Sequence, residues 1–187
     1  MPTLSKKPSI CVYCGSRPGA RPSYQLAATA LGTALATQNW RLVYGAGDVG
    51  LMGAVARAAT TARGDTFGVI PTHLMQMEVG KRDLTRFVVT ENMHERKKVM
   101  FMNSDAIVML PGGAGSLDEF FEVLTWRQLA LHNKPIFLLN VDDYWSPLVQ
   151  LVDHIIDEGF ADCSLKSFIS IIPSVDILIE ELKQSFS

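Results

Sequence analysis

Short apolar runs alternate with longer stretches of helical spacing along the whole chain. Continuous apolar runs of about four to eight residues are typical of strands that are buried on both faces of a sheet. We assign such strands to Ser9–Tyr13, Arg41–Tyr44, Thr66–Ile70, Phe87–Thr90, Ala106–Leu110, Pro135–Leu139 and Ser167–Ile172. The stretches between them predict helices over Pro22–Asn39, Leu51–Ala62, Met93–Asn103, Ser116–Leu131, Ser146–Gly159 and Asp176–Gln184, with Asn39, Gly64 and Ser146 as expected end residues.

Strands that alternate with helices in this way predict βαβ crossovers and a parallel sheet covered on both faces. We therefore expect an α/β fold, with one Rossmann-like, doubly wound domain over residues 1–187 and a mostly parallel sheet of about seven strands flanked by helices. Residues 1–8 are expected to form a flexible N-terminal segment. Residues 72–86 have no clean periodicity and predict a connecting loop with one short helical turn. Ligands of such sheets bind beyond the carboxyl ends of the strands, where the winding reverses.

The charge balance argues against a general nucleic-acid binder, because 17 Lys and Arg residues face 19 Asp and Glu residues. The chain is 48% hydrophobic, which suits a globular domain, and no apolar run approaches the ~20 residues that cross a membrane. Cys11 and Cys14 lie in and at the end of a strand, so we interpret them as structural rather than redox cysteines. The histidines lack the spacing of metal ligands. We expect a cytoplasmic protein that binds no metal, no nucleic acid and no membrane.

The turn after the second strand, Gly45–Gly50, has the form G-x-G-x-x-G and leads into a helix. Its glycines permit positive φ angles and let backbone N–H groups approach an anion. A dinucleotide site also requires an acidic residue at the end of the next strand, whereas Asp65 precedes that strand. Three interpretations stay open: a site for a phosphate-sized anion, which we favour, a merely tight turn, and a dinucleotide site.

A second glycine-rich turn, Pro111–Gly115, follows the most clearly buried strand. The helix after it aims free N–H groups and the positive end of its dipole at the space beyond the strand. Ser116 and Glu119 have the spacing of a capping box, in which Glu119 would only fold back on the helix start. The alternative is that Glu119 is a catalytic acid or base, and spacing alone does not choose between the two.

Three cations, Arg96, Lys97 and Lys98, lie early in the helix that is predicted to begin at Met93. Positive charge at this end opposes the helix dipole. The run fits either a solvated charged face or a site in which Arg96 and Lys97 turn towards an anion, with the planar fork of arginine suited to phosphate or carboxylate. The adverse position in the dipole favours the second interpretation slightly.

Taken together, these motifs resemble one known family. Pro111–Glu119 is similar to the PGGxGTxxE signature of the Lonely Guy (LOG) family, the cytokinin riboside 5′-monophosphate phosphoribohydrolases. Met93–Lys97 is similar to the MHxRK segment of that family, and Tyr44–Gly53 to its YGGGxxGLMG turn. The similarity also includes Cys14–Ser16 and residues 124–140, so that it covers most of the chain.

The resemblance implies hydrolysis of the N-glycosidic bond of AMP or N6-prenylated AMP to a free base and ribose 5-phosphate. It implies no cofactor, and a homodimer or an assembly of dimers with sites near the subunit interface. Arg96 and Glu119 are the implied catalytic pair, in which Glu119 stabilises the positive charge that builds on the ribose. The implied nucleotide-binding residues are Ser16, Gly45, Gly47, Gly50, Glu78, Arg96, Lys97, Gly113, Ala114, Gly115, Ser116, Leu117, Asp118, Glu119 and Thr125.

Two positions depart from the family pattern, since Ala46 replaces a glycine and Ser116 replaces the usual threonine. Serine keeps the hydroxyl group, whereas Ala46 would tighten the first turn and alter substrate preference. Members of the family are sometimes labelled lysine decarboxylases, but no lysine here identifies a Schiff-base site, and we reject that label. Two other classes of function stay open: a non-catalytic carrier of a nucleotide or cofactor with a Rossmann-like fold, and a dinucleotide-dependent oxidoreductase that rests on Gly45–Gly50 alone.

Overall fold

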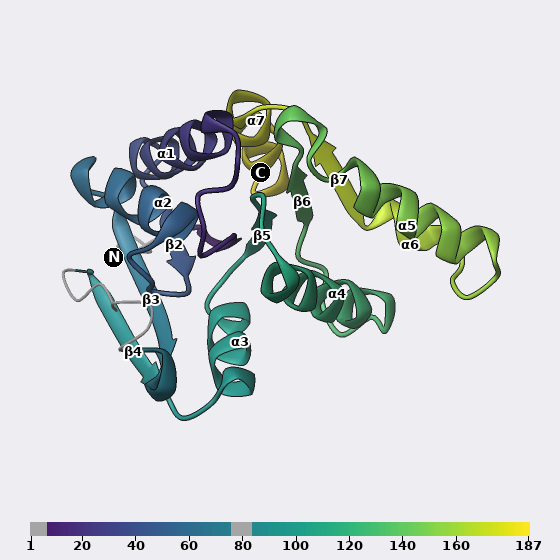
Figure 1. Ribbon diagram of the computed structural model, residues 1–187, viewed down its shortest axis with the longest axis horizontal. Coiled ribbons are helices and arrows are strands. Elements are labelled where there is room, and N and C mark those ends of the chain that lie inside the picture. Colours follow the sequence, from purple (N-terminus) through teal and green to yellow (C-terminus); the bar gives the residue numbers. More distant parts are fainter. Residues whose placement is uncertain (1–6, 76–83) are drawn as a thin grey trace.

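The computed structural model describes residues 7–75 and 84–187 (Figure 1). The strands are β1 (Ser9–Tyr13), β2 (Arg41–Tyr44), β3 (Asp65–Pro71), β4 (Arg86–Thr90), β5 (Ala106–Met109), β6 (Ile136–Leu139) and β7 (Ile169–Ile172). The helices are α1 (Pro22–Thr37), α2 (Gly50–Thr61), α3 (Met93–Met102), α4 (Ala114–Gln128), α5 (Ser146–Asp157), α6 (Ser164–Ser167) and α7 (Val175–Ser185), with short 3-10 turns η1 (Thr72–Leu74) and η2 (Val141–Asp143). The expectations for residues 1–6, for Glu78 and for most of the 72–86 loop lie outside the described residues.

The seven strands form one sheet in the order β4-β3-β2-β1-β5-β6-β7, and every neighbouring pair is parallel. The chain begins in the middle at β1, adds β2, β3 and β4 on one side, and then returns through α3 to place β5 on the other side of β1. The winding therefore reverses between β1 and β5, where doubly wound sheets open a crevice for ligands. The expected α/β fold with a Rossmann-like parallel sheet is confirmed.

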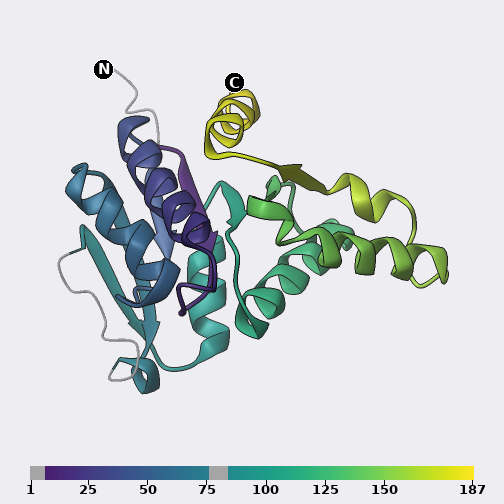
Figure 2. The same ribbon diagram turned by 45° about the horizontal axis from the view of Figure 1, so that its top comes forward.

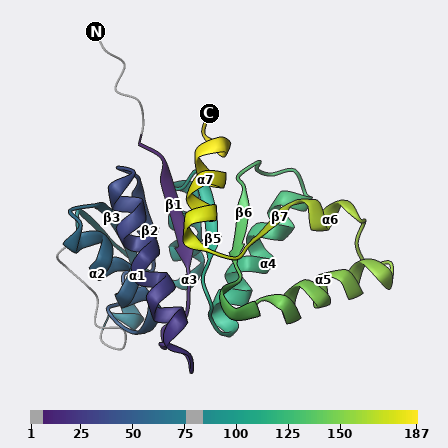
Figure 3. The ribbon, with the colours of Figure 1, turned by 90° about the horizontal axis from the view of Figure 1, so that it is seen from above.

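Helices cover both faces of the sheet, with α1, α2 and α7 on one face and α3, α4 and α5 on the other (Figure 3). Side chains alternate between these layers along each strand. In β1, Ile10 and Val12 belong to one core and Cys11 and Tyr13 to the other. This double burial explains why residues 10–13 of β1 are apolar without interruption in the sequence. The contacting pair α5 and α6 lies at the opposite end of the molecule from α1 and α2 (Figure 2).

Two helices on the same face end in a left-handed residue, which turns the chain into the next strand. Asn39 has a φ of 57° after α1, which confirms it as the end signal. After α2, Arg63 rather than Gly64 is left-handed, also with a φ of 57°, so the prediction of Gly64 as the cap is wrong. Position 64 requires glycine for another reason, which is the close approach of α1. A Cβ atom there would lie 2.7 Å from the Cβ atom of Ala36.

Several other element ends differ from the predictions, and three of them show why. Helix α4 begins at Ala114 rather than at Ser116, with Gly113 as its N-cap. Helix α5 begins at Ser146 with Trp145 as its N-cap, so Ser146 is not the cap. Strand β7 begins only at Ile169, because the residues before it form α6. The glycines around the start of α4 have low helix propensity, which hides that start in the sequence.

Within the described ranges, no helix combines the length and the apolar character needed to cross a membrane. The same residues contain no group of three or more His, Cys, Asp or Glu side chains that could hold a metal ion. Cys11 and Cys14 are both buried. Burial raises the pKa of the Cys11 thiol, whereas a reactive redox cysteine needs a lowered pKa. This supports the interpretation of Cys11 as a structural residue.

Candidate active site

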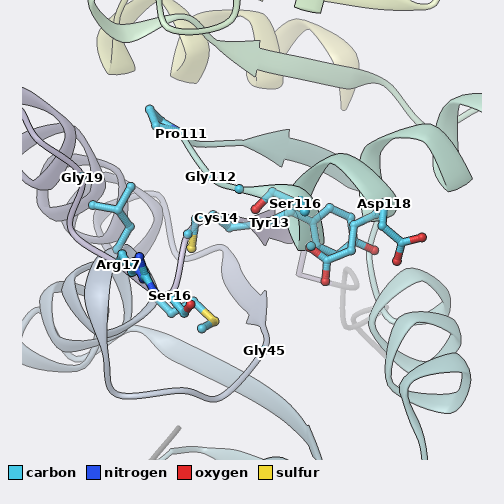
Figure 4. A pocket seen from close by; sticks show the side chains of 18 of the residues that line it. Tyr13, Cys14, Ser16, Arg17, Gly19, Gly45, Pro111, Gly112, Ser116 and Asp118 are labelled. Atoms are coloured by element: carbon cyan, nitrogen blue, oxygen red, sulfur yellow. The ribbon is translucent and has the colours of Figure 1, made fainter.

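A cavity of about 640 Å³ lies beyond the carboxyl ends of β1, β2 and β5, at the reversal of the winding (Figure 4). Its volume is in the range of about 300–1,000 Å³ that is typical of small-molecule sites. The loop after β1, the beginnings of α2 and α4, and one side of α3 form its walls. Of the implied nucleotide-binding residues, the cavity brings together Ser16, Gly45, Arg96, Gly113, Ala114, Gly115, Ser116, Asp118 and Glu119.

The other implied residues that the structure describes do not line this cavity. Leu117 packs instead against the core beneath α4. Gly47, Gly50, Lys97 and Thr125 are absent from the cavity walls, although Lys97 contacts Asp118, which does line the cavity. Glu78 lies outside the described residues, so its role stays a prediction.

Arg96 is buried and held by backbone carbonyl groups at the ends of two strands. Its Nε atom donates to the carbonyl oxygen of Val69 at 3.1 Å, and its Nη2 atom donates to the carbonyl oxygen of Gly45 at 2.6 Å. A Cβ atom on Gly45 would lie 2.1 Å from Nη2, so this position accepts only glycine while the guanidinium group stays in place. The hypothesis of a purely solvated face is therefore wrong for Arg96, which is 5% exposed.

Lys97 is also buried, but it faces carboxylates of α4 rather than the cavity. Its Nζ atom lies 2.6 Å from Glu122 and 3.0 Å from Asp118. Burial by itself would lower the pKa of Lys97, but the hydrogen bonds and charges of these two carboxylates raise it above the ordinary value. Lys97 thus keeps its positive charge at neutral pH and joins α3 to α4. The hypothesis that Lys97 turns towards a bound anion is not supported.

The start of α4 decides between the two interpretations of Glu119. Because Gly113 is the N-cap, Ser116 is the third residue of the helix and cannot be the capping residue of a box with Glu119. The cap interpretation is wrong. Ser116 instead covers Gly112, where a Cβ atom would lie 2.1 Å from the Ser116 Oγ atom. Glu119 follows one turn into the helix and lines the cavity together with Arg96.

The first turn of α4 leaves backbone amide groups exposed at the cavity. No side chain caps this helix, and the first N–H groups of any helix have no intrahelical acceptor. Cβ atoms on Gly113 or Gly115 would meet nothing within 4 Å, so the space in front of these amides is open. Such a helix start attracts anions through its N–H groups and its dipole.

The start of α2 differs from that of α4, because its amides are already bound. The backbone N–H groups of Leu51 and Met52 donate to the carbonyl oxygen of Gly15 at 3.1 and 3.4 Å. Gly50 has a φ of +55°, and a Cβ atom there would lie 2.3 Å from the carbonyl carbon of Ser16. Gly45–Gly50 is therefore a tight turn that supports the loop after β1, and the interpretations as an anion site or a dinucleotide site are not supported.

Ala46, the departure in that turn, has the left-handed φ of 58° at which the family pattern has glycine. It is fully buried and does not line the cavity. A Cβ atom on Gly68 of β3 would lie 2.7 Å from the Ala46 Cβ atom, so the alanine methyl group fills the space that this glycine leaves. An effect of Ala46 on substrate preference stays a prediction.

Three tyrosines that the sequence analysis did not identify as site residues line the cavity, namely Tyr13, Tyr24 and Tyr144. Tyr13 is 2% exposed, and burial, followed by the nearby Cys11 and Glu119, raises its pKa well above the ordinary value, so that its hydroxyl group stays neutral. Tyr144 donates from its hydroxyl group to the carbonyl oxygen of Gly112 at 2.5 Å and so supports the second glycine-rich turn. The position of Tyr144 shortly after β6 was the available signal, since loops at the carboxyl ends of strands carry sites in such sheets.

The cavity thus combines an open helix start, a fixed guanidinium group, a carboxylate and a neutral phenol. A helix start suits a phosphate group. A carboxylate within the same cavity can stabilise positive charge that develops on a bound substrate. The arrangement suits a small phosphorylated molecule whose reacting centre becomes cationic.

Comparison with known proteins finds a matching family model and similar plant proteins. The family model described as "Possible lysine decarboxylase" matches residues 52–182. A "Probable cytokinin riboside 5'-monophosphate phosphoribohydrolase" of Oryza sativa subsp. japonica is 43% identical over 94% of this chain and 72% of its own length. A cytokinin riboside 5′-monophosphate phosphoribohydrolase of Arabidopsis thaliana is 42% identical over 97% of this chain and 84% of its own length.

Solved structures show the same fold at lower identity. The molybdenum cofactor binding protein of Rippkaea orientalis has a TM-score of 0.75 and 24% identity, over 98% of this chain and 99% of that chain. The molybdenum cofactor carrier protein of Chlamydomonas reinhardtii has a TM-score of 0.73 and 23% identity, over 97% and 98% of the two chains. At this identity the likeness concerns the fold alone.

Proposed function

Because this chain belongs to the LOG family of cytokinin riboside 5′-monophosphate phosphoribohydrolases, we propose that it hydrolyses the N-glycosidic bond of a nucleoside 5′-monophosphate. The products are the free base and ribose 5-phosphate, and the substrates are AMP and its N6-prenylated forms. The observation that carries the proposal is the meeting of Arg96 and Glu119 in one cavity with the open start of α4.

The start of α4 holds the 5′-phosphate in this proposal. Gly113, Gly115 and the uncapped first turn leave room for an anion to approach the backbone amides. Glu119 follows Ala114 by five residues, which is a rise of about 7.5 Å along the helix. A ribose ring and its 5′-carbon can bridge this spacing, so a phosphate at the helix start places the sugar beside the Glu119 carboxylate.

Glu119 stabilises the transition state. Cleavage of the glycosidic bond builds positive charge on the ribose ring. A carboxylate in a partly enclosed cavity stabilises such a charge better than it would in bulk solvent. The same carboxylate can hold the attacking water or a ribose hydroxyl group. Tyr13, which stays neutral, adds a hydroxyl group at the cavity wall without adding charge.

Arg96 acts on the opposite part of the substrate. It is bound to carbonyl groups at the ends of β2 and β3, whereas α4 follows β5 on the other side of β1. With the phosphate at α4, the base therefore extends towards Arg96. A fixed guanidinium group there stabilises the negative charge that develops on the base as it leaves. Nearby methionine and leucine side chains give this part an apolar wall, formed by Leu51, Met52, Leu74, Met93 and Met100.

The description "possible lysine decarboxylase" fits the site poorly. Among the described residues, no lysine lines the cavity. Lys97, the lysine that lies beside it, binds two carboxylates through its Nζ atom and keeps its positive charge. A Schiff base would require a neutral amine directed at the substrate.

A homodimer belongs to the same proposal. Three large apolar side chains are exposed at the C-terminal ends of α3 and α4, namely Met102, Leu129 and Leu131. The two helix ends lie side by side, because Phe101 of α3 contacts Trp126 of α4. Apolar groups that gather on one surface favour association. Light scattering after gel filtration tests this, with the mass of one 20.6 kDa chain as the contradicting result.

Product chromatography tests the reaction itself. We expect AMP and isopentenyladenosine monophosphate to yield free base and ribose 5-phosphate, and the matching ribosides without phosphate to react far more slowly. The comparison of the two monophosphates shows which base the cavity prefers. Tight binding of AMP without any release of base would instead favour a carrier protein.

A further inference from the structure

We infer that Arg17 determines the preference of this site for a 5′-phosphate over an unphosphorylated ribose, an inference that rests on the proposed function. Arg17 lies in the loop after β1 and lines the cavity. The sequence motifs did not identify it, because it belongs to no glycine-rich turn and no charge run. Its place at the cavity, next to Ser16, is visible only in the folded chain (Figure 4).

The loop that carries Arg17 is fixed on both sides. The backbone N–H group of Gly15 donates to the carbonyl oxygen of Pro111 at 2.9 Å, which joins the loop to the turn before α4. The carbonyl oxygen of Gly15 accepts from the first amides of α2. Gly50 approaches the backbone nitrogen of Arg17 so closely that a Cβ atom on it would lie 2.4 Å away. The loop is therefore joined through Gly15 to the turn before α4, and the backbone of Arg17 itself lies beside Gly50 at the start of α2.

Two cations line the described part of the cavity, and their environments differ. Arg96 is buried and bound to carbonyl groups at the ends of β2 and β3. Arg17 follows β1, the neighbour of β5 in the sheet, and its side chain is exposed. Within the described residues Arg17 makes no hydrogen bond or ion pair. Arg21, further along the same loop, is bound to the carbonyl oxygen and the carboxylate of Asp142.

A guanidinium group in the same cavity as an open helix start suits a phosphate monoester. The helix amides bind one side of the dianion, and the planar fork of Arg17 can donate two parallel hydrogen bonds to the other side. Such charge-assisted hydrogen bonds change affinity by about 10- to 100-fold. A riboside has no charge at this position, so it gains nothing from Arg17. Arg17 thus raises the affinity of the site for monophosphates but not for ribosides. The apolar part of the cavity contacts the base in both kinds of ligand.

Titration calorimetry on the full chain tests this inference with AMP, adenosine and ribose 5-phosphate. We expect wild type to bind AMP at least about tenfold more tightly than adenosine. In Arg17→Gln, we expect the affinities for AMP and ribose 5-phosphate to fall about 10- to 100-fold and that for adenosine to stay within about twofold. Arg17→Lys restores the charge without the fork and should recover part of the loss. Arg21→Gln removes an equal charge from the same loop outside the cavity, and should leave the ratio of the affinities unchanged.

The outcomes separate this inference from the proposed function. A wild type that binds AMP no better than adenosine, or an Arg17→Gln variant that keeps the wild-type ratio, overturns the role of Arg17. Equal losses in Arg17→Gln and Arg21→Gln also overturn it, because they indicate a general charge effect. A wild type that prefers AMP and depends on Arg17, yet releases no base from AMP, supports the inference and refutes the proposed hydrolysis.

Discussion

The Nζ atom of Lys97 lies 2.6 Å from a carboxylate oxygen of Glu122, and this ion pair joins α3 to α4. The proposed catalytic residues stand next to the members of this contact. Arg96 precedes Lys97 in the chain, and Glu119 follows Asp118, the second carboxylate that Lys97 contacts. A buried charge therefore sets the distance between the two helices that carry the proposed chemistry.

Replacement of this lysine tests its role in holding the helices together. We expect Lys97→Met to lower the free energy of unfolding by about 1–3 kcal/mol, because it leaves two carboxylates without their cation and one of them, Glu122, is half-buried. Urea denaturation at neutral pH measures the loss. Lys98→Met, on the exposed side of the same helix, should change stability by less than about 0.5 kcal/mol. Equal stability of the two variants would contradict the structural role of Lys97.

The stability that this ion pair contributes should depend on pH in a defined way. The pKa of Lys97 is raised above the ordinary lysine value of 10.5, so the pair contributes its full stability below that pH and loses it as the pH rises through the higher folded value. The difference in stability between wild type and Lys97→Met should thus stay constant from pH 7 to about pH 10. A difference that disappears near neutral pH would contradict this assignment.

Glu119→Gln separates catalysis from helix capping. Gly113 occupies the N-cap position of α4, so Glu119 takes no part in a capping box. The loss of the Glu119 charge should therefore leave the free energy of unfolding within about 1 kcal/mol of wild type. Turnover of AMP should fall by at least about 100- to 1,000-fold, since the charge on the ribose loses its stabilising carboxylate. Single-turnover release of base measures the effect, and Glu158→Gln, an exposed residue just after α5, is the matched control. Near-normal turnover of Glu119→Gln would remove Glu119 from the proposed mechanism.

Replacement by alanine should have different effects at Gly45, in the first glycine-rich turn, and at Gly115, in the second. Gly45→Ala places a methyl group 2.1 Å from the Arg96 guanidinium, so we expect a loss of stability of about 1–3 kcal/mol and a marked loss of turnover. Gly115→Ala meets no atom of the protein within 4 Å and should slightly raise stability, because alanine is the better helix former. Its methyl group, however, enters the space proposed for the phosphate, so KM should rise. Equal stabilities of the two variants would contradict the fixed position of Arg96.

The buried, hydrogen-bonded environment of His132 leads us to expect a loss of stability in mild acid. Burial lowers the pKa of His132 below the ordinary value of 6.5, although its hydrogen bond to Val123 partly opposes this. The Nδ1 atom accepts from the backbone N–H group of Lys134 at 3.1 Å, which requires an unprotonated nitrogen. The stabilising contribution is full above pH 6.5 and is lost as the pH falls towards the lower folded value. Denaturation at pH 7.5 and pH 5 should therefore show a stability decrease that becomes smaller in His132→Gln, and an unchanged decrease would assign it to other groups.

Local patterns were sufficient for the seven strands, for all helices except α6, and for the position of the site. Apolar runs identified all seven strands, most clearly the central ones, because strands buried on both faces are apolar almost without interruption. The two glycine-rich turns were correctly placed beyond the carboxyl ends of strands, where the cavity lies. Local patterns did not settle the role of Glu119. A helix capped by Ser116 would make Glu119 part of a capping box, whereas the observed start at Ala114 does not.

The sequence by itself determined the parallel α/β fold and identified Arg96 and Glu119 as candidates, because periodicity and short motifs report on neighbours along the chain. Only the tertiary structure decided that the amides of α2 bind Gly15 while those of α4 stay open, that Lys97 pairs with α4, and that Arg17 reaches the cavity. Each of these depends on which strands lie side by side in the sheet. Strand order is a property of long-range packing, and no local pattern contains it.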